Sequence, residues 1–235
     1  MFAIYKREMR SYFTTPIGYI FIGVFLALSG GIFSFCTLQL FDAADPYSFF
    51  TFLLFGFAIL IPLLTMKLFS EERKLKTEQL LLTSPVTLTG MVLAKFLAAF
   101  TMFALTFLAS CCYFLILPQY GEINGAILFG NIISILLVGA AFIAVGVFVS
   151  SLSENQLNAA IGTIAILGVM LVISFLSAYI DNAFIRTVFG WLSIFTRFMN
   201  FTYGIFDYSA LLYYISIAFV FLFLTVRVYE KRRWD

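Results

Sequence analysis

Six long apolar runs, separated by shorter polar stretches, dominate the pattern of this chain. With charged residues taken as boundaries, the runs cover 17–40, 49–68, 92–117, 126–150, 156–180 and 208–227. The hydrocarbon core of a bilayer is about 30 Å thick, so a helix needs roughly 20 apolar residues to cross it. Each run meets that length. The pattern therefore predicts an all-α integral membrane protein with six transmembrane helices.

Composition supports the same class of protein. Of the 235 residues, 63% are hydrophobic and 11% are charged, whereas soluble domains carry about 25% charged residues. No stretch is polar enough to form a separate soluble domain, so we expect residues 1–235 to make a single transmembrane domain. The first run contains "LALSG" (26–30), which could suit a signal-peptide cleavage site. The run continues to Phe41, however, which favours a retained helix.

The basic residues predict the orientation of the chain. An even number of spans places both termini on one side, and lysine and arginine gather on the cytoplasmic side. Arg186 and Arg197 lie in the 181–207 connection, on the opposite side. The other twelve basic residues lie near the N-terminus, between 67 and 95, and near the C-terminus. Both termini are therefore expected to be cytoplasmic.

The apolar runs lack the side chains that membrane chemistry requires. Their midsections contain no Asp, Glu, Lys, Arg or His, which disfavours an ion-driven carrier. Lys67 and Lys95 lie at predicted cytoplasmic helix ends, where we expect their long side chains to reach the headgroups. Histidine is absent from the chain, and Cys36, Cys111 and Cys112 lie in apolar runs without the spacing of a metal site.

The sequence also lacks the motifs of an enzyme. It contains no H-E-x-x-H zinc motif and no G-x-x-x-x-G-K-[ST] phosphate loop. We expect no catalytic residues, no metal site and no cofactor in this chain. An ATPase that powers it would have to be a separate polypeptide.

Residues 2–13, "FAIYKREMRSYF", form an amphipathic pattern ahead of the first span. At 100° per residue, one arc of about 100° holds the larger apolar side chains Phe2, Tyr5, Met9, Tyr12 and Phe13. The rest of the helix is mainly polar, with Ile4 as the exception, and holds Lys6, Arg7, Glu8, Arg10 and Ser11. Such a helix lies in the headgroup plane with its cations near anionic lipid. The alternative is an ordinary positive flank to the first span.

A charged segment, "EERKLKTEQLLLTSPVT" (71–87), separates the second and third runs. Ser70 could cap a helix whose first turn holds Glu71 and Glu72, and Pro85 would end it. One face of that helix would carry Leu75, Glu78, Gln79 and Leu82. This mixed face suits docking into a cleft of another protein. The alternative is a solvated connector that holds the loop in the cytoplasm.

Three motifs resemble the ABC-2 type permeases, the membrane subunits of one class of ATP-binding-cassette transporters. The charged segment is similar to their E-x-R/K…T-x-E-x-L-L-x-[ST]-P-[VIL] segment. "KREMRSYFTTPIGYIF" (6–21) resembles their N-terminal basic helix and first span, and "FTRFMNFTYGIFD" (195–207) resembles their stretch before the last span. The similarity covers essentially the whole chain. It is greatest to the compact permeases of the gliding-motility and copper-processing branch.

The resemblance implies a function and its partners. Such permeases pair with a second permease copy, as a homodimer or a closely related heterodimer, and dock on two copies of an ATPase subunit that binds ATP and magnesium. Segment 71–84 matches the cytoplasmic coupling helix that enters a groove of the ATPase. The contact residues carried over to this chain are Glu72, Thr77, Glu78, Leu81, Leu82, Thr83 and Pro85. Nucleic acid is not an expected partner, whereas membrane lipid is.

The resemblance also implies short re-entrant helices before the last span. The residues that match this outer segment are Trp191, Arg197, Phe198, Phe201, Gly204 and Asp207. Aromatic side chains favour the membrane interface, and the alternative is a peripheral extracellular loop. The first span carries a row of small residues, Gly23, Ala27 and Gly31, and the fourth carries Gly146 and Ser150. Such rows serve either dimerisation or packing within one chain.

The resemblance therefore predicts the permease subunit of an ABC transporter, most simply an exporter, in the inner membrane of a prokaryote. The alternative is a non-transporting membrane anchor that couples a cytoplasmic ATPase to extracytoplasmic machinery. Transport of a defined compound in vesicles separates the two.

Overall fold

The computed structural model describes most of the chain as helix. The described residues are 1–35, 46–79, 87–115, 125–179, 190, 193–202 and 207–234, and no strand occurs among them. The α-helices are α1 (Phe2–Thr14), α2 (Pro16–Ile32), α3 (Pro46–Thr65), α4 (Lys67–Lys74), α6 (Leu88–Ser110), α7 (Gly125–Leu152), α8 (Gln156–Tyr179), α10 (Ile194–Thr202) and α11 (Tyr208–Trp234). A short 3₁₀ helix, η2 (Cys111–Leu115), continues α6.

Within the described residues, six helical stretches are long and apolar enough to cross a membrane, which confirms the predicted fold class. They are Pro16–Phe35, Ser48–Lys74, Leu88–Leu115, Gly125–Leu152, Gln156–Ser174 and Tyr208–Arg233. Each overlaps one of the predicted spans. The second stretch extends beyond the predicted end at 68, because α4 follows α3 after a single turn residue, Met66. The predicted ends at 40, 117 and 180 lie outside the described residues.

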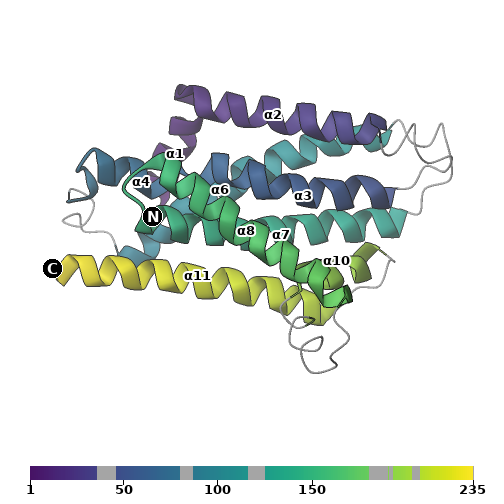
Figure 1. The fold of residues 1–235 in the computed structure, drawn as a ribbon. Helices are drawn as coiled ribbons and strands as arrows, with labels where there is room; N and C mark the ends of the chain where they lie inside the picture. The colour runs from purple at the N-terminus through teal and green to yellow at the C-terminus, as the bar shows by residue number, and fades with distance from the viewer. Residues whose placement is uncertain are drawn as a thin grey trace.

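The long helices lie side by side in one bundle around α7 (Figure 1). α7 contacts α3, α4, α6, α8, α10 and α11, so it forms the centre of the packing. The two termini and α4 lie at one end of the bundle, which we call the N/C end, and α10 lies at the other (Figure 1). This agrees with the even number of spans. Which side of the membrane the N/C end faces stays a prediction.

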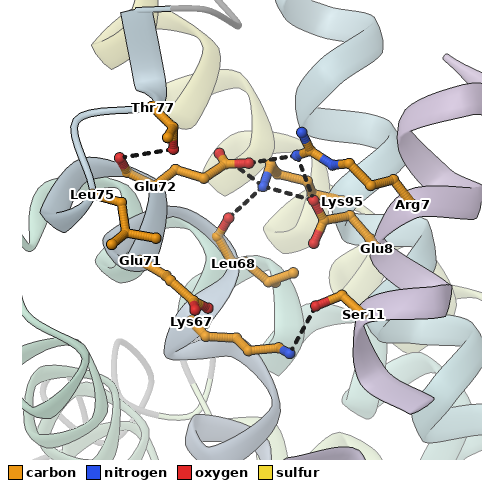
Figure 2. A pocket seen from close by; sticks show the side chains of 10 residues that line it. All are labelled: Arg7, Glu8, Ser11, Lys67, Leu68, Glu71, Glu72, Leu75, Thr77 and Lys95. Carbon is orange, nitrogen blue, oxygen red and sulfur yellow. Dashed lines mark hydrogen bonds and ion pairs between the residues drawn. The ribbon is translucent and has the colours of Figure 1, made fainter. Parts of the chain in front are cut away.

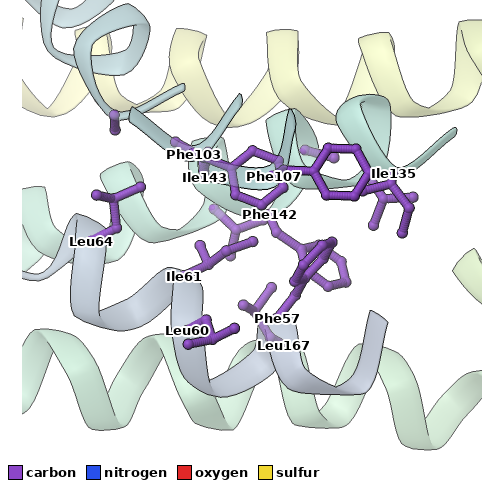
Figure 3. Packing of buried hydrophobic residues seen from close by; sticks show 14 of the residues in the cluster. Phe57, Leu60, Ile61, Leu64, Phe103, Phe107, Ile135, Phe142, Ile143 and Leu167 are labelled. Atoms are coloured by element: carbon purple, nitrogen blue, oxygen red, sulfur yellow. The ribbon is translucent and has the colours of Figure 1, made fainter. Parts of the chain in front are cut away.

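Interlocking aromatic rings fill the interior between α3, α6 and α7 (Figure 3). The rings of Phe57 and Phe103 meet edge to face at 5.1 Å. Phe103 lies directly over Gly139 of α7, where an added Cβ would come within 2.2 Å of the ring. The helices approach closely here because α7 offers no side chain at that position.

The small residues of α7 pack inside this chain. A Cβ at Gly146 would lie 2.3 Å from the Thr65 hydroxyl oxygen. One turn further, the Ser150 hydroxyl accepts from the backbone amide of Phe69 at 3.1 Å and donates to the carbonyl of Met66 at 3.1 Å. This pair therefore fixes the α3–α4 connection to α7.

The charged segment departs from the predicted single helix. Ser70 lies inside α4, where its hydroxyl donates to the Met66 carbonyl, so the prediction that it caps a helix was wrong. The helix starts earlier because Leu68 and Phe69 are buried and continue the packing of α3. α4 then ends, and residues 75–77 form a turn before helical structure resumes at Glu78.

A Schellman motif ends α4. The amide of Thr77 donates to the Glu72 carbonyl at 3.0 Å and that of Lys76 to the Arg73 carbonyl at 3.1 Å, which is the hydrogen-bond pair of this motif. Lys76 takes the left-handed conformation, with φ 56°, at the position that glycine usually occupies. The turn redirects the chain, so Leu75 and Glu78 do not share one helical face as predicted.

Candidate functional site

Four ionisable side chains from three helices meet at the N/C end (Figure 2). Arg7 and Glu8 come from α1, Glu72 from α4 and Lys95 from α6, and we call this cluster the charged junction. The Lys95 ammonium lies 3.1 Å from Glu8 Oε1 and 2.9 Å from Glu72 Oε2. Arg7 completes the ring, at 2.8 Å from Glu8 and 2.5 Å from Glu72. The junction therefore joins the N-terminal helix α1 to α4 and to α6.

Lys95 is the buried centre of the junction. Its residue is 0% exposed, and besides the two carboxylates it donates to the Leu68 carbonyl at 2.5 Å. These three acceptors match the three donors of an ammonium group. The expectation that Lys95 reaches the headgroups was wrong. Since removing a lysine charge from water costs several kcal/mol, its side chain turns inward only because the carboxylates meet it there.

Glu8 faces the protein although the helical wheel placed it on the polar side. It is 7% exposed, and the buried residues of α1 are Ile4, Glu8 and Tyr12. The Tyr12 hydroxyl donates to the Leu64 carbonyl at 3.0 Å. α1 is a helix as predicted, but the face that packs against the bundle includes Ile4 and Glu8, which the prediction had placed on the polar side. Periodicity within α1 could not predict this burial, because the partner of Glu8, Lys95, lies on another helix.

The electrostatics favour the charged forms of Glu8 and Arg7. Burial alone would raise the pKa of the Glu8 carboxyl, but the charges and hydrogen bonds of Lys95 and Arg7 outweigh burial and lower this pKa below its usual value of 4.5. Burial likewise opposes the charge of Arg7, and Glu8 and Glu72 reverse the effect, so the pKa of Arg7 is raised. The attraction among these groups therefore exceeds the cost of burying them.

Lys67 forms a second tie between α1 and α4. It was also expected to reach the headgroups, but it is 4% exposed. Its ammonium donates to the hydroxyls of Ser11 at 3.2 Å and Thr15 at 3.0 Å. The ammonium also lies 4.8 Å from the centre of the Tyr12 ring. The expectation was wrong because the end of α1 supplies these partners.

An open cavity of about 510 Å³ lies against the charged junction. Its lining combines the junction with both ends of α4 and the turn that follows (Figure 2). The lining residues are Arg7, Glu8, Ser11, Lys67, Leu68, Glu71, Glu72, Leu75, Thr77 and Lys95. Three bases and three acids line it together, so the cavity carries no excess of either charge.

Two arginines tie the other side of the charged segment to the bundle. Arg73 forms an ion pair with Glu154 at 2.7 Å and donates to the Leu152 carbonyl at 2.8 Å. Arg232 of α11 pairs with Glu78 at 3.1 Å and donates to the Ser151 carbonyl at 2.7 Å. The segment thus contacts the end of α7 and the C-terminal helix as well as α1.

The structure separates the predicted contact residues of the charged segment. Glu72 and Glu78 form ion pairs inside this chain. Thr77 is exposed, and its hydroxyl donates to the Glu72 carbonyl at 3.3 Å. The other predicted contacts lie outside the described residues; these are Leu81, Leu82, Thr83 and Pro85.

The predicted outer segment lies at the opposite end of the bundle, where α10 precedes α11 (Figure 1). Phe198 and Phe201 are buried, and the Arg197 guanidinium lies 4.2 Å from the centre of the Tyr213 ring. Asp207 accepts from the Ser209 amide at 2.8 Å, at the start of α11. Trp191 and Gly204 lie outside the described residues. How deeply α10 enters a membrane stays a prediction.

The comparisons with known proteins assign a family to this chain. The family model described as "ABC-2 family transporter protein" matches residues 3–232. The match spans α1, the charged junction and all six apolar helices. A search of the curated proteins gave no match.

Proposed function

This chain belongs to the ABC-2 family of transporter proteins. From that premise we propose that a conformational change in a separate ATPase displaces α4, and that α4 transmits this displacement to α1 and α6. Members of this family are the transmembrane permease components of ABC transporters. Nucleotide binding in such systems belongs to partner ATPase subunits. The chain is accordingly a permease subunit, and its route of coupling is the open question.

One observation carries the proposed route, the sharing of Glu72 between Arg7 and Lys95. One carboxylate of α4 bonds to α1 through Arg7 and to α6 through Lys95. A displacement of α4 therefore either moves both neighbours or breaks two ion pairs, one of which is buried. Breaking a buried pair costs about 3–5 kcal/mol, so concerted movement is the easier outcome. Movement of packed elements as units is a common way to transmit a switch.

We place the ATPase contact on the turn after α4 and on the residues that follow it. Leu75 is 64% exposed at the tip of this turn, and Lys76 and Thr77 beside it are exposed too. An exposed leucine among polar side chains suits the apolar centre of a protein contact. Thr77 and Glu78, with Leu81, Leu82, Thr83 and Pro85, remain the proposed contact set. Glu72 acts inside this chain.

The remaining features of the complex are also proposals. Two ATPase subunits and two permease copies would form the transporter, with the N/C end in the cytoplasm of a prokaryote and export as the direction. Gly23 and Gly31 have nothing within 4 Å of an added Cβ, and Ala27 is exposed. This row on α2 is therefore open to a second copy. The gliding-motility and copper-processing branch is the subgroup we favour.

The docking proposal is tested by binding of the ATPase subunit to the purified permease. Leu75→Ser should weaken binding at least tenfold, because it removes the apolar tip. Leu115→Ser is the matched control, since Leu115 is 78% exposed in η2 and far along the chain from the charged segment. Equal affinity of the two variants would place the contact elsewhere. ATP hydrolysis by the reconstituted complex without movement of any compound would favour the membrane-anchor function.

A further inference from the structure

An apolar groove lies between the start of α1 and the middle of α6. It has a volume of about 440 Å³ and is lined by Met1, Phe2, Tyr5, Leu97 and Thr101. None of these residues belongs to the charged junction. The junction engages Arg7 and Glu8, whereas the groove uses the neighbouring face of α1.

The polar atoms of the groove already have partners. The Tyr5 hydroxyl donates to Thr101 Oγ1 at 3.2 Å, and the Thr101 hydroxyl lies 2.9 Å from the Leu97 carbonyl. Its remaining lining is the hydrocarbon of Met1, Phe2 and Leu97. A polar or charged small molecule would lose its hydration here without gaining partners, while a hydrocarbon chain would bury apolar surface.

The groove opens toward the lipid-facing surface of α6. Leu97 is 38% exposed, and Leu105, two turns further on the same helix, is 59% exposed. Eight residues of helix span about 12 Å, so this exposed stripe leads from the groove into the apolar belt of the bundle. An acyl chain of the surrounding bilayer can enter without crossing a polar barrier.

Two basic side chains follow Phe2 along α1. Phe2, Lys6 and Arg10 are spaced by four residues, so they form one row along α1, and all three are exposed. In the part of the chain that the structure describes, seven ion pairs occur and none includes Lys6 or Arg10. An apolar groove on a helix that also carries exposed cations outside these ion pairs complements a molecule with a hydrocarbon chain and an anionic head.

We propose that this groove binds an anionic phospholipid, with one acyl chain between α1 and α6 and the phosphate on Lys6 and Arg10. The cations attract the anionic headgroup, and the groove orders the chain. A bound lipid would add a further link between α1 and α6, on the side away from Arg7. It would therefore stabilise the docked position of α1 whether or not α4 transmits force.

Native mass spectrometry of the full chain tests the proposal. The protein is released from nanodiscs that contain equal amounts of phosphatidylglycerol and phosphatidylcholine with identical acyl chains. We expect one phosphatidylglycerol to be retained per chain, at least fivefold over phosphatidylcholine. Equal retention of the two lipids would overturn the proposal.

Matched variants locate the site. Leu97→Trp fills the groove and should abolish the preference, whereas Leu157→Trp on α8, at a position that is 67% exposed, should keep it. Lys6→Gln with Arg10→Gln should lower retention at least fivefold, and Lys231→Gln with Arg233→Gln, two exposed basic residues of α11, should not. Unchanged retention of phosphatidylglycerol in Leu97→Trp and in the Lys6→Gln, Arg10→Gln double variant would overturn the site. Loss of a dimer from Leu97→Trp alone, with lipid retention intact, would make the groove a contact between copies and would overturn it too.

Discussion

At the scale of the residue, Lys95 decides how the N/C end is built. A lysine near the end of an apolar run predicts a side chain that reaches the headgroups. Nothing in the run itself indicates that the side chain is buried. Its two partners lie on other helices. Glu8 is in α1, 87 positions earlier in the chain, and Glu72 is in α4. Single-helix periodicity cannot pair such residues. A lone acid in a basic helix, a lone lysine in an apolar one and a charged segment between spans were the available signals.

Lys95→Met should destabilise the protein by about 3–5 kcal/mol, because it keeps the bulk but leaves Glu8 and Glu72 without their buried cation, with only Arg7 to pair with both. Adding Glu8→Gln should recover part of the loss, since the more deeply buried carboxylate is then neutral. Unfolding of the detergent-solubilised protein by denaturant measures both. Lys231→Met, at an exposed position, is the control. Equal stability of the two lysine variants would contradict the buried pairing.

Lys76 stores strain in the turn after α4. A non-glycine residue in the left-handed region costs about 1–2 kcal/mol, partly offset because glycine has more entropy to lose on folding. Lys76→Gly should therefore raise the free energy of unfolding by about 0.5–1 kcal/mol. Lys74→Gly, two residues earlier inside α4, should lower it by a similar amount. A loss of stability in both variants would show that the turn is not strained.

At the scale of the element, the six spans were predictable and the charged segment was only partly so. Length and hydropathy determine a span because a bilayer sets its thickness. The end of α4 depends instead on a Schellman turn whose key position holds lysine, so the usual glycine signal is missing. The burial of Leu68 and Phe69 likewise depends on α7, which supplies Ser150 for the backbone of α4. The second is a tertiary effect, and it overrides the local cap predicted at Ser70.

The docking of α1 should weaken in acid. The pKa of Glu8 lies below 4.5 when α1 is docked and returns toward 4.5 when it is released. The stabilisation is therefore fully present above about pH 4.5 and is lost as the pH falls through the lowered pKa. Hydrogen exchange of the α1 amides should show less protection below that pH. In Glu8→Gln this part of the pH dependence should disappear, and its persistence there would assign the effect to another group.

The role of Glu78 can be divided between its internal and external contacts. Glu78→Arg places two like charges together at Arg232 and should impair coupling or assembly with the ATPase while membrane insertion is preserved. Glu78→Arg with Arg232→Glu restores the internal pair in reverse. If Glu78 contacts the ATPase, coupled ATPase activity should stay low in the double variant. Full recovery would assign Glu78 to the internal pair alone, and normal activity of the single variant would remove it from coupling.

At the scale of the whole molecule, the structure places the charged junction and both termini at one end. α1, α4 and the end of α11 meet there, and α10 lies at the other end (Figure 1). The even number of spans and the clustering of basic residues predicted this polarity. The sequence alone could not show that α4 shares one carboxylate with two other helices. Through that link α1, α4 and α6 are connected at the N/C end, and the aromatic packing around α7 holds the rest of the bundle together.

The movement of α1 during the ATPase cycle tests this account most directly. Spin labels at exposed positions of α1 and α11, Phe13→Cys and Leu212→Cys, in a background without the native cysteines, report the distance between the helices with and without ATP. Glu72→Gln removes the two ion pairs between α4 and the other helices of the junction, while Lys95 keeps its pair with Glu8, and Glu71→Gln is the matched control. We predict that ATP shifts the distance in the parent protein and in Glu71→Gln but not in Glu72→Gln, with the ATPase bound in all three. An equal shift in Glu72→Gln would contradict transmission through the charged junction.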